Sequence, residues 1–201
     1  MRVDPETEAR CRATVASLAV DAFKDHQLTL VREGLWKCAR PERWTYGFFV
    51  AAMPGAIVCY GDTPDALLRV YPCASADDAV AWLRGATRSP EYLFEKLTSK
   101  DAWQVFYRGD ALRTAQEWRR EYADEAPGKY DRLVAEVVEA GDELTHEKWC
   151  ELCQELAVDD AYSVGVGWDG SAWWVVEALR AFVRLRDAEL AASPMGTEVT
   201  A

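Results

Sequence analysis

The segment from Leu35 to Cys73 reads LWKCARPERWTYGFFVAAMPGAIVCYGDTPDALLRVYPC. Breaks at Pro41, Pro54-Gly55 and Thr63-Pro64-Asp65 divide it into apolar runs, and these residue types favour turns. The runs are short and rich in aromatic and β-branched residues, which is typical of strands. Together with the run that precedes it, the segment predicts an antiparallel meander of four or five strands over about 28–72.

Helical patterns flank the meander on both sides. Asp4-Pro5-Glu6 is typical of a helix start, and the apolar spacing extends this helix to about His26. Further helix starts follow the meander in the sequence, at Ser75, Ser89-Pro90 and Thr145. Residues 102–107 fit either a strand or a link between helices. We therefore expect an α+β fold, in which the N-terminal helix packs on the meander and a mainly helical C-terminal half follows.

The predicted helices have apolar stripes that indicate which sides face the core. At 201 residues the chain is long enough for one domain. Residues 1–100 are expected to form the helix and meander, residues 101–190 an acidic helical region of the same domain, and residues 191–201 a frayed tail. The predicted inward-facing residues include Leu18, Ala19 and Phe23, Leu133, Val137 and Val138, and Trp149, Leu152, Cys153 and Leu156.

Charge is distributed unevenly along the chain. The net charge is −11, and residues 121–160 hold 13 acidic residues against Lys129, Arg132 and Lys148, a balance of −10. Such a surface repels nucleic acid and favours a protein partner with a basic surface; alternatively, it is a solvated helical face that aids solubility. The candidate partner surface consists of glutamates on the predicted helices: Glu136, Glu139, Glu147, Glu151 and Glu155.

A second candidate site lies at the turns of the meander. Basic and aromatic residues cluster there at Arg40, Arg43, Trp44 and Tyr46, and Asp62 lies in a nearby turn. This cluster could face a small ligand, or it could be cross-strand packing within the hairpin.

Catalytic and metal-binding signals are weak. The only histidines are His26, which we interpret as a cap at a helix C-terminus, and His146. His146, Cys150 and Cys153 share one helical face and have zinc-ligand chemistry. However, a helix holds Cys-x-x-Cys differently from a zinc-binding loop, and no second pair exists, so we expect no metal. Nucleotide-binding and hydrolase motifs are also absent, so no cofactor is expected and a non-catalytic role is favoured.

The chain shows no signal for secretion or membrane insertion. No apolar run approaches the ~18 residues needed to span a bilayer, and the charged N-terminus does not fit a signal peptide. The six cysteines are too few for a disulfide scaffold and are expected to remain thiols. We therefore expect a cytoplasmic protein without a membrane partner.

Several of these motifs resemble a family of proteins, with no assigned activity, that are carried by actinobacterial phages and by genomes hosting their prophages. Arg40-Pro41, Tyr46-Gly47-Phe48, Pro54-Gly55 and Gly61-Asp62 match its R-P, Y-x-F, P-G and G-D pattern. The segment SPEYLFEKL at 89–97 is similar to its proline-started helix ending in E-K-L. The resemblance covers roughly 35–100, and it departs after Gly61-Asp62, where the family tends to carry a glycine-containing turn into an aromatic strand.

The resemblance implies a phage or prophage accessory protein in the cytoplasm of a bacterial host. Together with the acidic helices, it favours a protein that acts by binding another protein and that could counter host defence. Two alternatives stay open. One is a small-ligand-binding protein or enzyme with a site at Arg40, Tyr46 and Asp62, and the other is an acidic mimic of DNA.

Overall fold

The computed structural model describes residues 7–98, 103–126, 128–158 and 164–192. The chain forms two compact units, each built from two segments. Unit 1 comprises residues 1–11 and 104–169, and unit 2 comprises residues 12–103 and 170–201. The N-terminal helix α1 (Thr7–Phe23) begins in unit 1 and continues in unit 2. The last helix, α7 (Gly170–Ala192), belongs to unit 2, although the sequence placed it with the acidic helices.

Unit 2 contains the predicted meander, which is confirmed as a five-stranded antiparallel sheet in the order β1-β2-β3-β4-β5. Each strand follows its neighbour in sequence, because the turns at Glu33-Gly34, Pro41-Glu42, Pro54-Gly55 and 62–65 reverse the chain. The strands are β1 (Gln27–Arg32), β2 (Leu35–Arg40), β3 (Arg43–Met53), β4 (Ala56–Gly61) and β5 (Ala66–Arg69).

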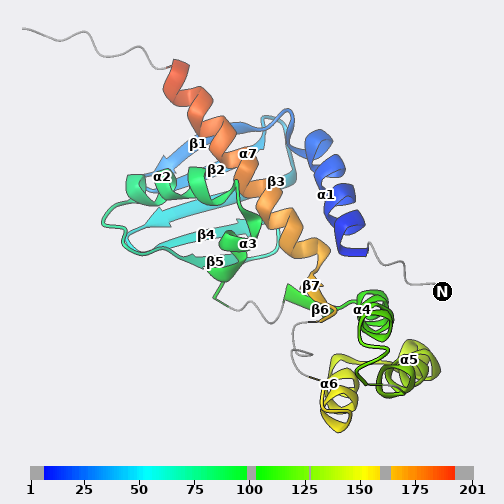
Figure 1. The fold of residues 1–201 in the computed structure, drawn as a ribbon. Coiled ribbons are helices and arrows are strands. Elements are labelled where there is room, and N and C mark those ends of the chain that lie inside the picture. Colours follow the sequence, from blue (N-terminus) through cyan, green and yellow to red (C-terminus); the bar gives the residue numbers. More distant parts are fainter. Residues whose placement is uncertain (1–6, 99–102, 127, 159–163, 193–201) are drawn as a thin grey trace, which may run out of the picture. The chain divides into compact units, whose positions relative to one another are not determined.

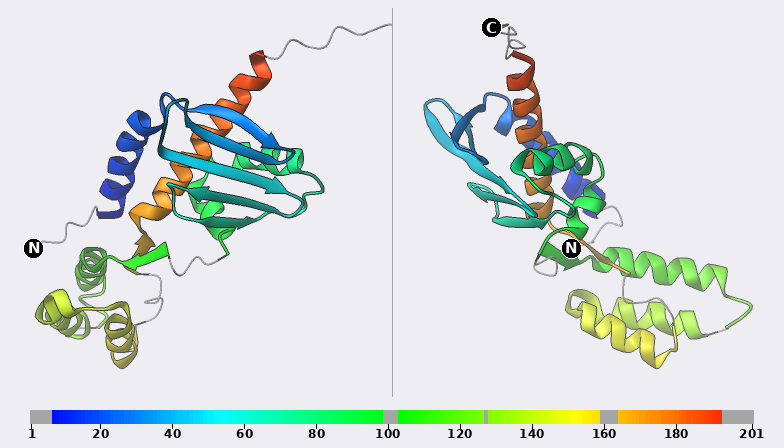
Figure 2. Two further views of the ribbon diagram at one scale, coloured as in Figure 1. Left: turned by 180° about the vertical axis from the view of Figure 1, so that it is seen from behind. Right: turned by 90° about the vertical axis from the view of Figure 1, so that its left-hand side faces the viewer.

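Helices cover one face of this sheet. Figure 1 shows α7 crossing the strands with α2 (Ala76–Ala86) and α3 (Pro90–Glu95) on the same side. Seen from behind, in Figure 2, the strands lie in front and no helix covers them. Ser75 caps α2 as predicted, because its Oγ accepts a hydrogen bond from the Asp78 N–H at 3.1 Å. Pro90 occupies the first turn of α3.

The alternation of side chains along the strands places the core beneath the helices. Phe48, Val50 and Ile57 are fully buried on the helix-covered face. Phe23 of α1 packs edge-on against Phe48 with ring centroids 5.5 Å apart, and Trp36 packs against Phe182 of α7 at 5.4 Å. These contacts fix α1 and α7 on the meander.

Unit 1 contains a short strand pair and a group of helices. Strands β6 (Gln104–Phe106) and β7 (Val166–Trp168) pair antiparallel. Between them the chain forms α4 (Arg108–Glu121), α5 (Lys129–Ala140), the short 3-10 helix η2 (Gly141–Glu143) and α6 (His146–Glu155). Their core is apolar and includes Ala111, Ala115, Leu133, Val137, Trp149 and Cys153. Thr145 caps α6 as predicted, since its Oγ1 accepts from the Lys148 N–H at 3.2 Å.

Some local predictions were wrong. Helix α1 ends at Phe23, so His26 lies beyond it. Its backbone N–H donates to the Phe23 carbonyl at 3.3 Å, but its imidazole donates to the Tyr46 carbonyl and does not cap the helix. Leu18 and Val138, predicted to face the core, are exposed. These two positions lie at the margin of their apolar stripes, where spacing alone does not fix the buried side.

The structure also shows where several other helices and strands begin and end. Residues 104–106 form a strand, and the helix that follows begins at Arg108. Ala191 and Ala192 still belong to α7. The predicted helix start at Asp4-Pro5-Glu6 and the remainder of the predicted tail, 193–201, lie outside the described residues.

The two neighbouring phenylalanines of β3 provide a test of the sheet's orientation. Changing Phe48 to alanine should lower the free energy of unfolding of unit 2 by about 3–5 kcal/mol, because it opens a cavity in the core. The matched change at Phe49, which is half-buried on the uncovered face, should cost clearly less. Urea denaturation followed by circular dichroism, with hydrogen exchange to assign the loss to unit 2, measures both. Equal losses would contradict this orientation.

Candidate functional site

The meander turns meet at a backbone distortion in β3. Tyr46 adopts a positive φ of 61°, which is rare for a bulky residue and costs roughly 1–3 kcal/mol. Its N–H donates to Asp62 Oδ2 at 3.1 Å, and its carbonyl accepts from His26 Nε2 at 2.9 Å. The Asp62 N–H in turn donates to the Gly47 carbonyl at 2.8 Å. These hydrogen bonds hold the distortion in place, and Asp62 is therefore engaged within the protein.

Two glycines allow an aromatic ring to lie on the backbone beside this distortion. A Cβ atom on Gly47 would come within 2.6 Å of the Trp44 ring, and one on Gly61 would come within 2.8 Å of the Gly47 carbonyl oxygen. Only glycine permits these close approaches. The Trp44 side chain nevertheless remains 41% exposed, so it is available for a contact with another molecule.

Trp44 belongs to a row of aromatic side chains that the sequence analysis did not assemble. Its ring centroid lies 5.3 Å from that of Phe49, and Phe49 stacks on Tyr60 at 5.1 Å. The Lys37 ammonium lies 5.4 Å from the Trp44 ring centroid. Lys37, Phe49 and Tyr60 are directly opposite one another on β2, β3 and β4. This row results from the register in which the three strands pair, and the sequence does not give that register directly.

Arg40 and Arg43, the two arginines of the candidate site at the meander turns, have different roles. Arg40 Nη2 donates to the carbonyls of Asp21 and Ala22 at 2.9 and 3.4 Å, and Arg184 of α7 donates to the Phe23 carbonyl at 3.2 Å. The last turn of α1 contains no basic residue of its own, so these guanidinium groups supply the positive charge that its terminal carbonyls favour. Arg40 is thus mainly a structural residue.

Arg43, by contrast, is exposed and lies at a surface hollow of about 290 Å³. The hollow is lined by Asp25, Arg40, Pro41, Glu42 and Arg43, and it therefore presents both signs of charge. The Nε atom of Arg40 is buried and has no hydrogen-bond partner among the described residues. A small polar ligand with both an anionic and a cationic group fits this chemistry.

His26 is a buried histidine with a fixed tautomer. Only 3% of it is exposed, and its ring lies beside those of Phe23 and Phe48, with centroids at 5.3 and 6.2 Å. Because a carbonyl can only accept, the bond to Tyr46 requires a proton on Nε2, and Nδ1 is buried with no partner in the described part of the chain. Burial lowers the pKa of His26, and the positive charge of Arg40 adds to this effect.

The candidate partner surface divides into paired and unpaired glutamates. Arg132 lies 3.6 Å from Glu136 and 3.8 Å from Glu155, so it links α5 to α6. Glu139, Glu147 and Glu151 are exposed and form no ion pair with a described residue. On α6, Trp149 and Cys153 are fully buried on the other side. The predicted outward face of α6 is therefore free of packing at Glu147 and Glu151.

The three candidate zinc ligands are not gathered into one group by the fold. Cys150 Sγ lies 3.5 Å from His146 Nε2, whereas Cys153 is fully buried in the apolar core of unit 1. No group of three or more potential ligands occurs in the part of the chain that the structure describes. Burial raises the pKa of the Cys150 thiol, and for Cys153 burial raises it to about 12. Both residues are therefore thiols rather than thiolates when no metal is bound, and a thiol is a poor nucleophile.

Comparisons with known proteins give no further assignment. No protein-family model, no curated protein sequence and no solved structure matches the chain. Among the helices described, none has the length and apolar character that would let it cross a membrane. The function must therefore be argued from the chemistry of the two units.

The buried His26 predicts a loss of stability in mild acid. The pKa of His26 is lowered in the folded chain. Below the ordinary pKa of about 6.5, the unfolded chain therefore binds the proton more readily than the folded chain does. The contribution of His26 is complete above that pH and declines below it, by at most ~1.4 kcal/mol per pH unit. Urea midpoints at neutral and mildly acidic pH measure this slope.

The matched variant for this test is His26→Gln. A glutamine amide keeps a donor for the Tyr46 carbonyl but does not titrate, so the variant should be less sensitive to pH between these conditions. An identical pH dependence in the two proteins would show that His26 is not responsible.

Proposed function

We propose that this protein is a phage or prophage accessory protein that binds another protein through the acidic helices of unit 1. The observation that carries this proposal is the separation of charge between the units. Unit 1 holds 9 Lys and Arg against 19 Asp and Glu, whereas unit 2 holds 14 against 15. Almost the whole net charge thus resides on one unit, where it can attract a basic partner surface.

The charge on α6 is also arranged at an energetic cost to the helix. Glu147, Glu151 and Glu155 follow one another at i, i+4 and i+8, and like charges at this spacing destabilise a helix by about 0.2–0.5 kcal/mol per pair. Arg132 relieves only Glu155. A basic partner would relieve the repulsion at Glu147 and Glu151 as well, which supports binding over simple solvation.

In this proposal the partner is a protein of the bacterial host, such as a component of its defence, and the complex forms in the host cytoplasm. The resemblance of residues 35–100 to actinobacterial phage proteins supports this setting. An acidic surface that occupies a nucleic-acid-binding site would be a DNA mimic. Competition between duplex DNA and this protein for the captured partner would reveal that case.

Charge reversal at Glu147 and Glu151 tests the acidic surface. The double change to lysine should weaken binding to a partner captured from the bacterial host by about tenfold or more, because it replaces attraction with repulsion. The thermal midpoint should change little, because both side chains are exposed. Binding should also weaken between 0.1 and 1 M salt, as the screening length falls from ~10 to ~3 Å.

The control reverses Glu33 and Glu42, two exposed acids of unit 2, and so produces the same change in net charge. Binding should survive in this control. Binding that survives both the α6 reversal and high salt would show that the acidic face only aids solubility.

The hollow beside Arg43 favours a second candidate function, the binding of a small zwitterionic ligand. Its lining residues carry both signs of charge, from Asp25 and Glu42 on one side and Arg40 and Arg43 on the other. A panel of free α-amino acids should raise the thermal midpoint of the wild type but not that of Arg43→Ala. Arg88→Ala, at another exposed arginine of unit 2, should respond like the wild type. No shift in the wild type would remove this candidate.

A further inference from the structure

One edge of the five-stranded sheet is covered and the other is open. At the β5 edge, the Arg69 N–H donates to the Lys96 carbonyl at 2.9 Å, and the Thr98 N–H donates to the Leu67 carbonyl at 3.0 Å. At the opposite edge, β1 pairs only with β2 among the described residues. Such an edge exposes unpaired backbone donors and acceptors, to which another strand can bind.

Strand β1 has little of the protection that open edges commonly carry. Its sequence is QLTLVR, with no proline and with a single charge at its last residue, Arg32. Leu30 and Val31 are 56% and 52% exposed. The pairing with β2 is regular up to Leu30 and is interrupted only between Leu30 and Arg32. An apolar and regular edge of this kind is suited to strand pairing.

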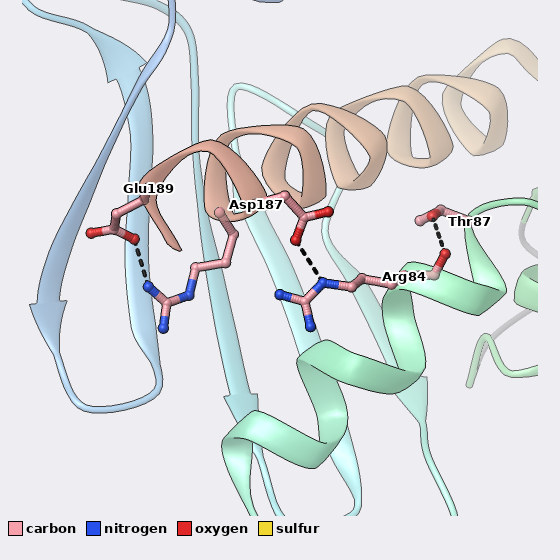
Figure 3. Close-up of polar contacts among 5 residues, drawn as sticks. Arg84, Thr87, Asp187 and Glu189 are labelled. Carbon is pink, nitrogen blue, oxygen red and sulfur yellow. Dashed lines mark hydrogen bonds and ion pairs between the residues drawn. The ribbon is translucent and has the colours of Figure 1, made fainter. Parts of the chain in front are cut away.

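Helix α7 adds a second exposed apolar element at the same edge. It contacts β1, and its last turns extend past the sheet in Figures 1 and 2. Figure 3 shows how this end is held: Arg84 of α2 donates to Asp187 at 2.6 Å, and Glu189 accepts from Arg186 at 2.6 Å. Leu190 at the end of the helix is 48% exposed. Leu190 is therefore an exposed apolar side chain on the helix that contacts β1.

We propose that a second copy of this chain occupies the open edge, so that β1 pairs antiparallel with β1 of the second copy and the sheet continues across the dimer. A two-fold axis places equivalent residues opposite each other, and directly opposite side chains share a face of the sheet. Centring the pair on Thr29 brings Leu28 opposite Leu30 of the second copy. Both leucines lie on the helix-covered face, because they pair with Cys38 and Trp36, which are buried there.

Charge favours the same chain as the occupant. Unit 2 carries a net charge of only −1, so two such edges approach without strong repulsion, whereas unit 1 carries −10. A strand of six residues spans about 20 Å, so edge pairing alone buries less than the ~1,600 Å² of a standard interface. The ends of α7 must contribute, and we expect a dissociation constant of about 1–100 µM.

Sedimentation equilibrium over ~1 to ~300 µM brackets that range. The wild-type mass should rise with concentration from 22.6 kDa towards twice that value. Thr29→Lys should weaken dimerisation about tenfold or more, because it places two like charges directly opposite each other. Hydrogen exchange at the amides of β1 should slow as the dimer forms.

The matched control is Leu67→Lys. Leu67 is 41% exposed and lies on β5, whose edge is already paired, so this variant should dimerise like the wild type. A monomer throughout the concentration range would overturn the proposal. A dimer that Thr29→Lys leaves intact, or that both variants weaken equally, would also overturn it. Because the charge reversal on α6 lies in unit 1, its result stands independently of this one.

Discussion

The fold of unit 2 depends on the hydrogen bonds that hold Tyr46 in its distorted backbone conformation. His26 holds the Tyr46 carbonyl from the end of α1, and Asp62 holds its N–H from the turn after β4. The Tyr46 ring lies 5.6 Å from that of Trp174 on α7. One strained residue thus joins the first helix, the meander and the last helix. The bond from Asp62 lies at the surface, whereas the bond from the buried His26 is partly shielded from competition by water.

This arrangement explains why residues that look suited to a ligand are mostly structural. Arg40 and Asp62 direct their polar groups at backbone atoms of their own unit, and the imidazole of His26 is buried. Of the other residues predicted to face a ligand, Arg43, Trp44 and Tyr46 remain exposed. Unit 1 is different. Apolar side chains fill its core, and carboxylates remain exposed on the outside of α6. The two units therefore offer different chemistry to other molecules.

The local elements could largely be predicted because their signals lie within a few residues. Pro54-Gly55 marks a turn, Ser75 and Thr145 cap helices, and the run from Phe48 to Val50 has the aromatic and β-branched residues that strands favour. The candidate sites were harder to predict. The row of Lys37, Phe49 and Tyr60 depends on the register between three strands, and the role of Arg40 depends on where α1 ends.

The sequence by itself determined the α+β composition, the meander, the helix caps and the concentration of acid between 121 and 160, because each follows from neighbouring residues. Only the tertiary structure decided that α7 completes unit 2, that His26 is buried and that β1 is an open edge. The physical reason is that these properties arise from contacts between residues far apart in the chain. Local spacing constrains the faces of a single helix or strand, but not the partners against which they pack.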